Sequence, residues 1–199
     1  ITGAVDSNIF SLALSLKQTT VDTNINYVFQ IGGLVVTLKS TGFRITGDLA
    51  TGALGARFDS INNGALVNDT SYILLFGYNS NTGYSCYLNN VSITPTSIVQ
   101  SSEVLDITTL YNNVNNTSTY NLMYFTTDYI DFSQEANRNL FVNQLGYPRD
   151  LQQLIDEGTI PNPLIYLPFD DTTNLGKNNG TGGDFTVNGT VTAGADFSI

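Results

Sequence analysis

The sequence predicts an all-β fold, an antiparallel β-sandwich with one or two short helices near residues 134–157. Three observations lead to this prediction. Many segments of the first two thirds alternate apolar and polar side chains with a period of two, as strands with one buried face do. Turns rich in Gly and Asn separate these segments at spacings near ten residues, which is typical of sandwiches. Helical patterns are confined to the last third, between residues 124 and 189.

The clearest strand pattern lies at residues 8–17. Phe10, Leu12, Leu14 and Leu16 fall on one face, while the residues between them are small or polar. A period of two over this length predicts a strand with one buried face. Similar patterns predict strands at residues 25–31, 34–39, 43–46, 53–58, 91–94 and 120–125, with a polar turn at residues 62–64.

Residues 72–88 predict a β-hairpin. Large apolar side chains alternate along both arms, and a five-residue loop at 79–83 joins them. The lone Cys86 cannot form an internal disulfide, and it shares a face with Tyr84 and Leu88, so we expect a buried, unreactive thiol. A further turn is expected at Asn89-Asn90, because Asn suits tight turns.

The last third contains the expected helices. Ser133 is a suitable N-cap for a helix at residues 134–143, and a second helix at 149–157 would end at Gly158. Two prolines bracket the entry into residues 164–167, which predicts a strand near a sheet edge. A loop is expected at residues 172–183, and a last pair of strands at 185–192.

Composition narrows the classes of function. The chain of 199 residues carries a formal charge of −10 and has no basic run, which argues against nucleic acid and against anionic membrane surfaces. The sequence contains no stretch of eighteen apolar residues, so it predicts no membrane-spanning helix. Histidine is absent, which removes the usual general base and zinc ligand. Asn and Thr together make up 48 residues, as in β-rich extracellular or virion proteins. Without a linker or a fixed repeat, residues 1–199 are expected to form a single domain.

Two parts of the sequence resemble a known family. The hairpin is similar in pattern to the laminin G-like and concanavalin A-like jelly-roll domains, although the Trp and His usual there are missing and Asn90 stands where Gly is usual. The last third resembles segments that recur in structural proteins of tailed bacteriophages that carry this jelly roll. The residues that carry the resemblance are 70–76, 84–90, 128–138, 162–167, 174–177 and 183–188.

This resemblance implies a concanavalin A-like jelly roll and a setting on the exterior of a virion. We therefore predict a non-enzymatic structural protein, either a capsid decoration (cement) protein or a fibre component, which docks on other capsid or tail proteins. A homo-oligomer is compatible with this role. The alternative is a carbohydrate-binding adhesin or receptor-binding module for host surface glycans. A glycan hydrolase is disfavoured, because the three Glu residues are scattered and form no pair with the spacing of a retaining glycosidase.

The best metal candidate is the group Asp170, Asp171 and Asn174. Hard oxygen ligands clustered in a loop suit calcium, which is the one cofactor we consider. The alternative is that the two carboxylates form Asx-type turns that close the loop. A second acidic group, Asp128 with Asp131 and Glu135, is explained by capping at the junction between strand and helix.

Three tyrosines near the tip of the hairpin are the candidate glycan-binding residues, because aromatic rings stack on the apolar faces of sugars. Tyr78 and Tyr84 also continue the buried face of the hairpin, which favours core packing for that pair. Tyr87 points the other way and is the freer candidate.

Overall fold

The computed structural model describes residues 9–18, 26–31, 34–39, 42–48, 54–59, 66–95, 97–99, 110–112, 118–171 and 173–187. The strands in these ranges are β1 (Ile9–Gln18), β2 (Asn26–Ile31), β3 (Leu34–Lys39), β4 (Gly42–Asp48), β5 (Leu54–Asp59), β6 (Thr70–Asn79), β7 (Gly83–Leu88), β8 (Val91–Ser92), β9 (Ser97–Val99), β10 (Leu110–Asn112), β11 (Ser118–Thr126) and β12 (Ile165–Leu167). Two short helices, α1 (Glu135–Phe141) and α2 (Gln152–Asp156), lie between β11 and β12.

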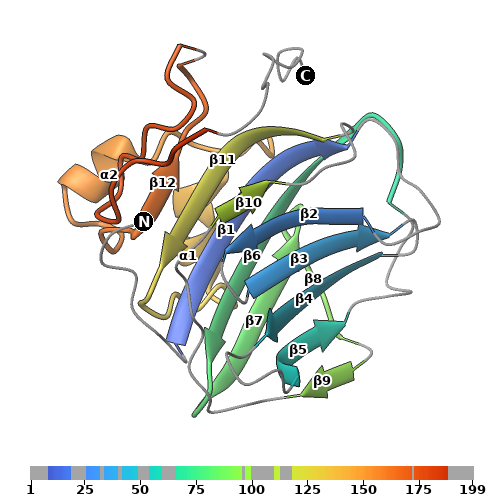
Figure 1. The fold of residues 1–199 in the computed structure, drawn as a ribbon. Coiled ribbons are helices and arrows are strands. Elements are labelled where there is room, and N and C mark those ends of the chain that lie inside the picture. The colour runs from blue at the N-terminus through green and yellow to red at the C-terminus, as the bar shows by residue number, and fades with distance from the viewer. Residues whose placement is uncertain are drawn as a thin grey trace.

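The strands form two antiparallel sheets. One has the order β12-β11-β1-β6-β7-β8 and the other the order β10-β2-β3-β4-β5-β9. Figure 1 shows the second sheet lying across the face of the first. The predicted antiparallel β-sandwich, with its two short helices, is confirmed. No helix in the described part of the chain is long and apolar enough to cross a membrane.

The main core lies between the two sheets. Phe10, Leu12, Leu14 and Leu16 are all buried there, as the alternation in β1 predicts. They pack with β3 and β4 of the opposite sheet, which contribute Leu34, Val36, Phe43 and Ile45. Each such side chain stabilises the fold by about 1.5–3 kcal/mol when it is fully buried.

A second core lies on the outer face of the first sheet. The prediction of a single buried face for β1 is wrong, because Ser11, Ala13 and Ser15 are also buried. Residues 128–163, which we call the covering layer, pack over this face. Figure 1 shows α1 behind β1 and β11, on the side away from the second sheet. The buried cluster consists of Ala13, Ile73, Leu75, Leu122, Tyr124, Ile130, Phe132, Phe141, Val142, Leu151, Ile160 and Tyr166.

The helices differ from their predicted bounds for local reasons. Ser133 is not the N-cap of α1, because that position is Gln134, which makes no capping side-chain bond. Instead, the Ser133 N–H donates to Asp131 Oδ1 at 2.9 Å, so the cap-like turn forms before the helix. The second helix begins at Gln152 rather than at residue 149, because the Arg149 N–H donates to Phe141 O at 2.9 Å. Gly158 ends this segment with φ +69°, as predicted.

The hairpin and the edge strand follow the sequence closely. Asn79 pairs with Gly83, so the loop between β6 and β7 shortens to residues 80–82. Asn89 and Asn90 have φ of +48° and +65°, the left-handed pair that a two-residue hairpin turn requires. β12 lies at the edge of its sheet and pairs with β11, as predicted.

The predicted strand pair at 185–192 is not formed where the structure describes it. Residues 183–187 run without strand pairing, although the Phe185 N–H donates to Gly176 O at 2.8 Å. Residues 188–192 and the predicted turn at 62–64 lie outside the described residues.

Candidate functional site

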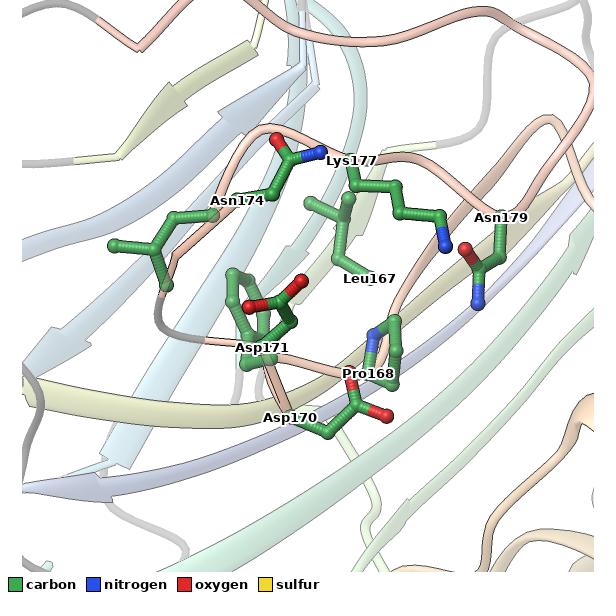
Figure 2. A pocket seen from close by; sticks show the side chains of 9 residues that line it. Leu167, Pro168, Asp170, Asp171, Asn174, Lys177 and Asn179 are labelled. Atoms are coloured by element: carbon green, nitrogen blue, oxygen red, sulfur yellow. The ribbon is translucent and has the colours of Figure 1, made fainter.

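A pocket of about 220 Å³ opens where the chain leaves β12. One loop supplies all of its walls, and Figure 2 shows Leu167 and Pro168 lying between the polar side chains. The lining residues are Leu167, Pro168, Phe169, Asp170, Asp171, Asn174, Leu175, Lys177 and Asn179. The pocket thus combines an apolar base with two carboxylates, two amides and one amine.

The three predicted metal-binding residues, Asp170, Asp171 and Asn174, all line this pocket. Asp171 is already engaged, because its Oδ1 accepts from the Thr173 N–H at 2.8 Å and from the Thr173 hydroxyl at 2.6 Å. These hydrogen bonds form the Asx-type turn that the sequence offers as the alternative, and they lower the pKa of Asp171 below its ordinary value. Among the described residues, no three His, Cys, Asp or Glu side chains gather as a metal site. Calcium binding stays a prediction.

The pocket loop is held by one buried amide, Asn178, which is only 8% exposed. Its Oδ1 accepts from the N–H groups of Tyr166 and Gly180 at 2.8 and 3.0 Å. Its Nδ2 donates to the carbonyls of Leu164 and Gly183, both at 3.0 Å. Asn178 therefore takes the place of a neighbouring strand along the open edge of β12, where backbone groups would otherwise lack partners.

Two glycines beside Asn178 allow the backbone of this loop to pack closely against neighbouring backbone. A Cβ on Gly180 would lie 2.7 Å from Leu164 O, and a Cβ on Gly176 would overlap Phe185 O. The Asn179 N–H donates to Tyr166 O at 2.9 Å, and the Gly182 N–H donates to Leu164 O at 2.9 Å. The Gly-rich run at residues 180–183 is thus an edge cover for β12.

Sequence reasoning missed the other six residues of the pocket, among them Lys177 and Asn179. These side chains belong to a loop with no periodic pattern. The hydrogen bonds of Asn178 and of the Asn179 N–H bring them to the end of β12. Phe169 also lines the pocket, with φ +55°, a conformation that costs a bulky residue free energy. Strain of this kind tends to gather at functional loops, but it is visible only in the folded backbone and not in the sequence.

The structure does not bring the three candidate tyrosines together on one surface. Tyr78 is 5% exposed in the main core, and Tyr84 packs against the same core. Tyr87 faces the covering layer, where the guanidinium carbon of Arg138 lies 4.2 Å from its ring centroid. Tyr87 points away from Tyr78 and Tyr84, as expected, but a cation already covers its ring. Glycan binding by these residues stays a prediction.

Arg138 joins the covering layer to the hairpin. Its Nη1 donates to the carbonyls of Phe132 and Ser133 at 2.8 and 3.0 Å, and its Nε donates to Asn90 Oδ1 at 2.6 Å. Arginine suits this position because one planar group can stack on a ring and reach several acceptors. Asn90 therefore has a side-chain partner of its own in Arg138.

The second acidic group has a structural role. Burial raises the pKa of Asp131, but hydrogen bonds from Ser133 and Gln134 outweigh burial and lower that pKa overall. Asp128 accepts a bond from the Thr126 hydroxyl at 3.2 Å. Glu135 is exposed at the first residue of α1, where the helix dipole favours an anion. These placements agree with the capping interpretation.

The remaining candidates for chemistry lie apart from the pocket. Cys86 is buried as predicted, and burial raises the pKa of its thiol well above the ordinary value. A thiol in that state is a poor nucleophile. Glu157 is exposed just after α2 and accepts a bond from Gln153 Nε2 at 2.7 Å, while Glu103 lies outside the described residues.

Comparison with known proteins gives likenesses of fold only. No protein-family model matches the sequence, and no curated protein matches it. A native heptameric SAP-like pentraxin from Limulus polyphemus aligns over 65% of this chain and 69% of its own, at 6% identity and a TM-score of 0.45. Trypanosoma rangeli sialidase in complex with sialic acid aligns over 71% of this chain but 24% of its own, at 14% identity and a TM-score of 0.47.

The receptor-binding domain of botulinum neurotoxin type G is a further match. It aligns over 66% of this chain and 38% of its own, at 11% identity and a TM-score of 0.43. The chain thus spans well under half of the sialidase and toxin structures. Likenesses of this strength say nothing about what this chain binds or catalyses.

Proposed function

We propose that this chain is a non-enzymatic structural protein of a tailed-phage virion, which docks on capsid or tail proteins at the exterior of the particle. The carrying observation is the place of the phage-like segments in the fold. Residues 128–138 lie in the covering layer, 162–167 lead into and form β12, and 174–177 and 183–187 flank the run 178–182 that closes the edge of that strand. The segments that resemble phage structural proteins therefore lie in neighbouring parts of the fold.

The contacts of these segments support a structural role for them. Arg138 and Asn178 spend their polar groups on internal partners, and the exposed acids of the segment 128–135 cap turns. A neutral-polar, weakly acidic surface remains for protein–protein docking, in keeping with the net charge of −10. We treat residues 1–199 as one domain, because β1, from the start of the chain, pairs with both β6 and β11.

Particle association tests this proposal. Particles purified on density gradients from the organism that encodes the chain are probed with antibodies raised against the folded domain. We expect the chain to co-sediment with intact particles and to be accessible to antibody without disruption. A chain that stays at the top of the gradient would contradict the virion role.

A second candidate function is a carbohydrate-binding adhesin or receptor-binding module. The pocket at the end of β12 favours it, because a concave site with several convergent polar groups can hold a small ligand. Glycan-array binding by the purified chain tests this candidate. Absence of any glycan signal, together with stable association with capsids, would leave the structural role alone.

Calcium at Asp170, Asp171 and Asn174 is a separate proposal with its own test. A bound ion stabilises the folded state by mass action, so calcium would raise the melting temperature and a chelator would lower it. An unchanged melting temperature in excess chelator would remove calcium from the account.

A further inference from the structure

We infer that the pocket beside β12 is a subsite for one neutral sugar ring, with Asp170, Asn174 and Lys177 as its hydrogen-bonding groups. This inference rests on the second proposed function, the carbohydrate-binding module. It places the site away from the hairpin tyrosines. Its starting point is the size of the pocket, about 220 Å³, which is smaller than the roughly 300–1,000 Å³ of sites for drug-sized ligands. Such a space admits a single ring.

The chemistry of the walls matches the two kinds of surface on a sugar ring. A sugar presents hydroxyl groups at its edge and C–H groups on its faces. In Figure 2 the carboxylates of Asp170 and Asp171, the amide of Asn174 and the amine of Lys177 surround Leu167 and Pro168. Carboxylates accept from hydroxyl groups, ammonium donates to them and amides do both. The apolar base faces the C–H groups.

The charge of the pocket selects against anionic sugars. Two carboxylates and one ammonium group leave an excess negative charge among the lining residues. A sugar carboxylate or sulfate in this space would meet like charges, which costs free energy at short range. Neutral rings avoid this cost.

The pocket is formed before any ligand arrives. Asn178 makes two hydrogen bonds to Tyr166 and Leu164 and two within the loop. The Lys177 N–H also donates to Asn174 O at 3.1 Å. Asn179 donates through its side chain to Gln152 Oε1 at 3.2 Å, which holds one wall against α2. The loop therefore loses little conformational entropy when a ligand binds, and this favours affinity for a small ligand.

The rival site at Tyr87 is less suited to stacking. The guanidinium of Arg138 lies over that ring, and it is held there by hydrogen bonds to Phe132, Ser133 and Asn90. A sugar would have to displace this group before it could stack. The pocket requires no such rearrangement.

The test is a titration of the full ¹⁵N-labelled chain, followed by ¹H–¹⁵N NMR, with D-glucose, D-galactose, D-mannose and N-acetyl-D-glucosamine. At least one of these sugars should shift the amide signals of residues 167–179, with a Kd on the order of 1 mM, as expected for so few ligand atoms. N-acetylneuraminic acid, which is anionic, should shift none of these signals.

Two variants sharpen the result. The double variant Asp170→Ala/Lys177→Met removes two exposed groups and leaves the net charge at −10. It should raise Kd by about tenfold or more, the loss expected when hydrogen bonds to charged groups are removed. Asp128→Ala, the matched control at an exposed Asp of the covering layer, should change Kd by less than about twofold. Unchanged melting temperatures verify folding.

The other outcomes distinguish a failure of the pocket as the subsite from a failure of the carbohydrate-binding function. If a neutral sugar binds but the double variant binds equally well, or the shifts map to Tyr87 and are lost in Tyr87→Leu, the pocket is not the subsite and the carbohydrate-binding function stands. If no neutral sugar shifts any signal of the unaltered chain, both the subsite and that function are overturned. Equal binding of N-acetylneuraminic acid would overturn the preference for neutral rings.

Discussion

Asn178 shows how one side chain can complete a sheet. Its four hydrogen bonds satisfy backbone groups of Tyr166, Leu164, Gly180 and Gly183, and the residue is almost fully buried. Nothing in the sequence distinguishes this Asn from the 22 others, because its role depends on a strand edge that forms only in the tertiary structure. The pocket loop and the edge of β12 both depend on it.

Replacement of Asn178 by Ala should therefore be costly. Four buried or half-buried groups would lose their partner, and we expect the free energy of unfolding to fall by about 2–4 kcal/mol. Urea denaturation followed by fluorescence measures the change. Asn162→Ala, at an exposed position in the same region, is the control and should stay within about 0.5 kcal/mol. An equal effect of both substitutions would contradict the role of Asn178.

Arg138 supports a second prediction at the residue scale. Arg138→Lys keeps the charge but loses the planar group that stacks on Tyr87 and bonds to Phe132, Ser133 and Asn90. We expect a loss of about 1–3 kcal/mol of stability, because Lys cannot reproduce this geometry. Asn90→Gly tests one of these bonds alone, since Gly keeps the φ of +65° without strain. An Arg138→Lys protein as stable as the unaltered chain would show that charge alone matters.

At the scale of elements, the covering layer explains the second buried face of β1. The Ser11 hydroxyl donates to Asp128 O at 2.9 Å and accepts from the Ile130 N–H at 2.7 Å. The Ser85 hydroxyl accepts from the Phe132 N–H at 2.9 Å. Small hydroxyl-bearing residues thus let an irregular backbone approach the sheet and satisfy it.

Gly77 makes the same close approach possible over β6. A Cβ at this position would overlap Ile130 O and lie 3.0 Å from Ser85 Oγ. Gly77→Ala should push the covering layer off the sheet and destabilise the fold by about 1–3 kcal/mol. Hydrogen exchange should accelerate first at Ile130 and Phe132, while the amides of β3 and β4 keep their protection. Uniform acceleration in all strands would contradict a local effect.

Periodicity predicts the strands well but not what covers them. Alternation in β1 fixes which side chains face the main core, and turn residues fix the hairpin and Gly158 as a helix end. The second core was not predictable in the same way, since it depends on an irregular segment more than a hundred residues away along the chain. The one available signal was that the outward positions of β1 begin with Ser11, Ala13 and Ser15 rather than charged residues.

The residues of the candidate site likewise fall into two groups, those that the sequence could predict and those that it could not. Asp170, Asp171 and Asn174 could be selected because their side chains have an obvious chemistry and lie close together in sequence. Lys177 and Asn179 could not, because their place in the pocket follows from the contacts of Asn178. Strand alternation predicts that Tyr87 and Tyr78 lie on opposite faces of the hairpin. It does not predict that Arg138 covers the Tyr87 ring.

For the whole molecule, stability should fall at high pH. Burial raises the pKa of Tyr124 and of Tyr166 well above their ordinary value near 10. The folded state therefore keeps both phenols protonated where the unfolded chain ionises them. Their contribution is fully present below about pH 10 and is lost as the pH rises above that value toward the folded pKa values.

Chemical denaturation at several pH values measures this effect. The free energy of unfolding should change little between about pH 6 and 8, since the chain has no histidine, and should fall above about pH 10. The double variant Tyr124→Phe/Tyr166→Phe should show a shallower fall, even if its stability at neutral pH is lower. A fall of the same steepness would assign the alkaline loss to other groups.

The described part of the chain forms two antiparallel sheets, a covering layer that closes a second core, and a pocket at the end of β12. We propose that the protein lies on the exterior of a particle, and cryo-electron microscopy of intact particles from the encoding organism tests this proposal most directly. We predict density for this β-sandwich on the outer surface, in contact with capsid or tail proteins, with the pocket of residues 167–179 open to solvent. Purified particles that lack the chain, or that hold it inside the shell, would contradict the claim.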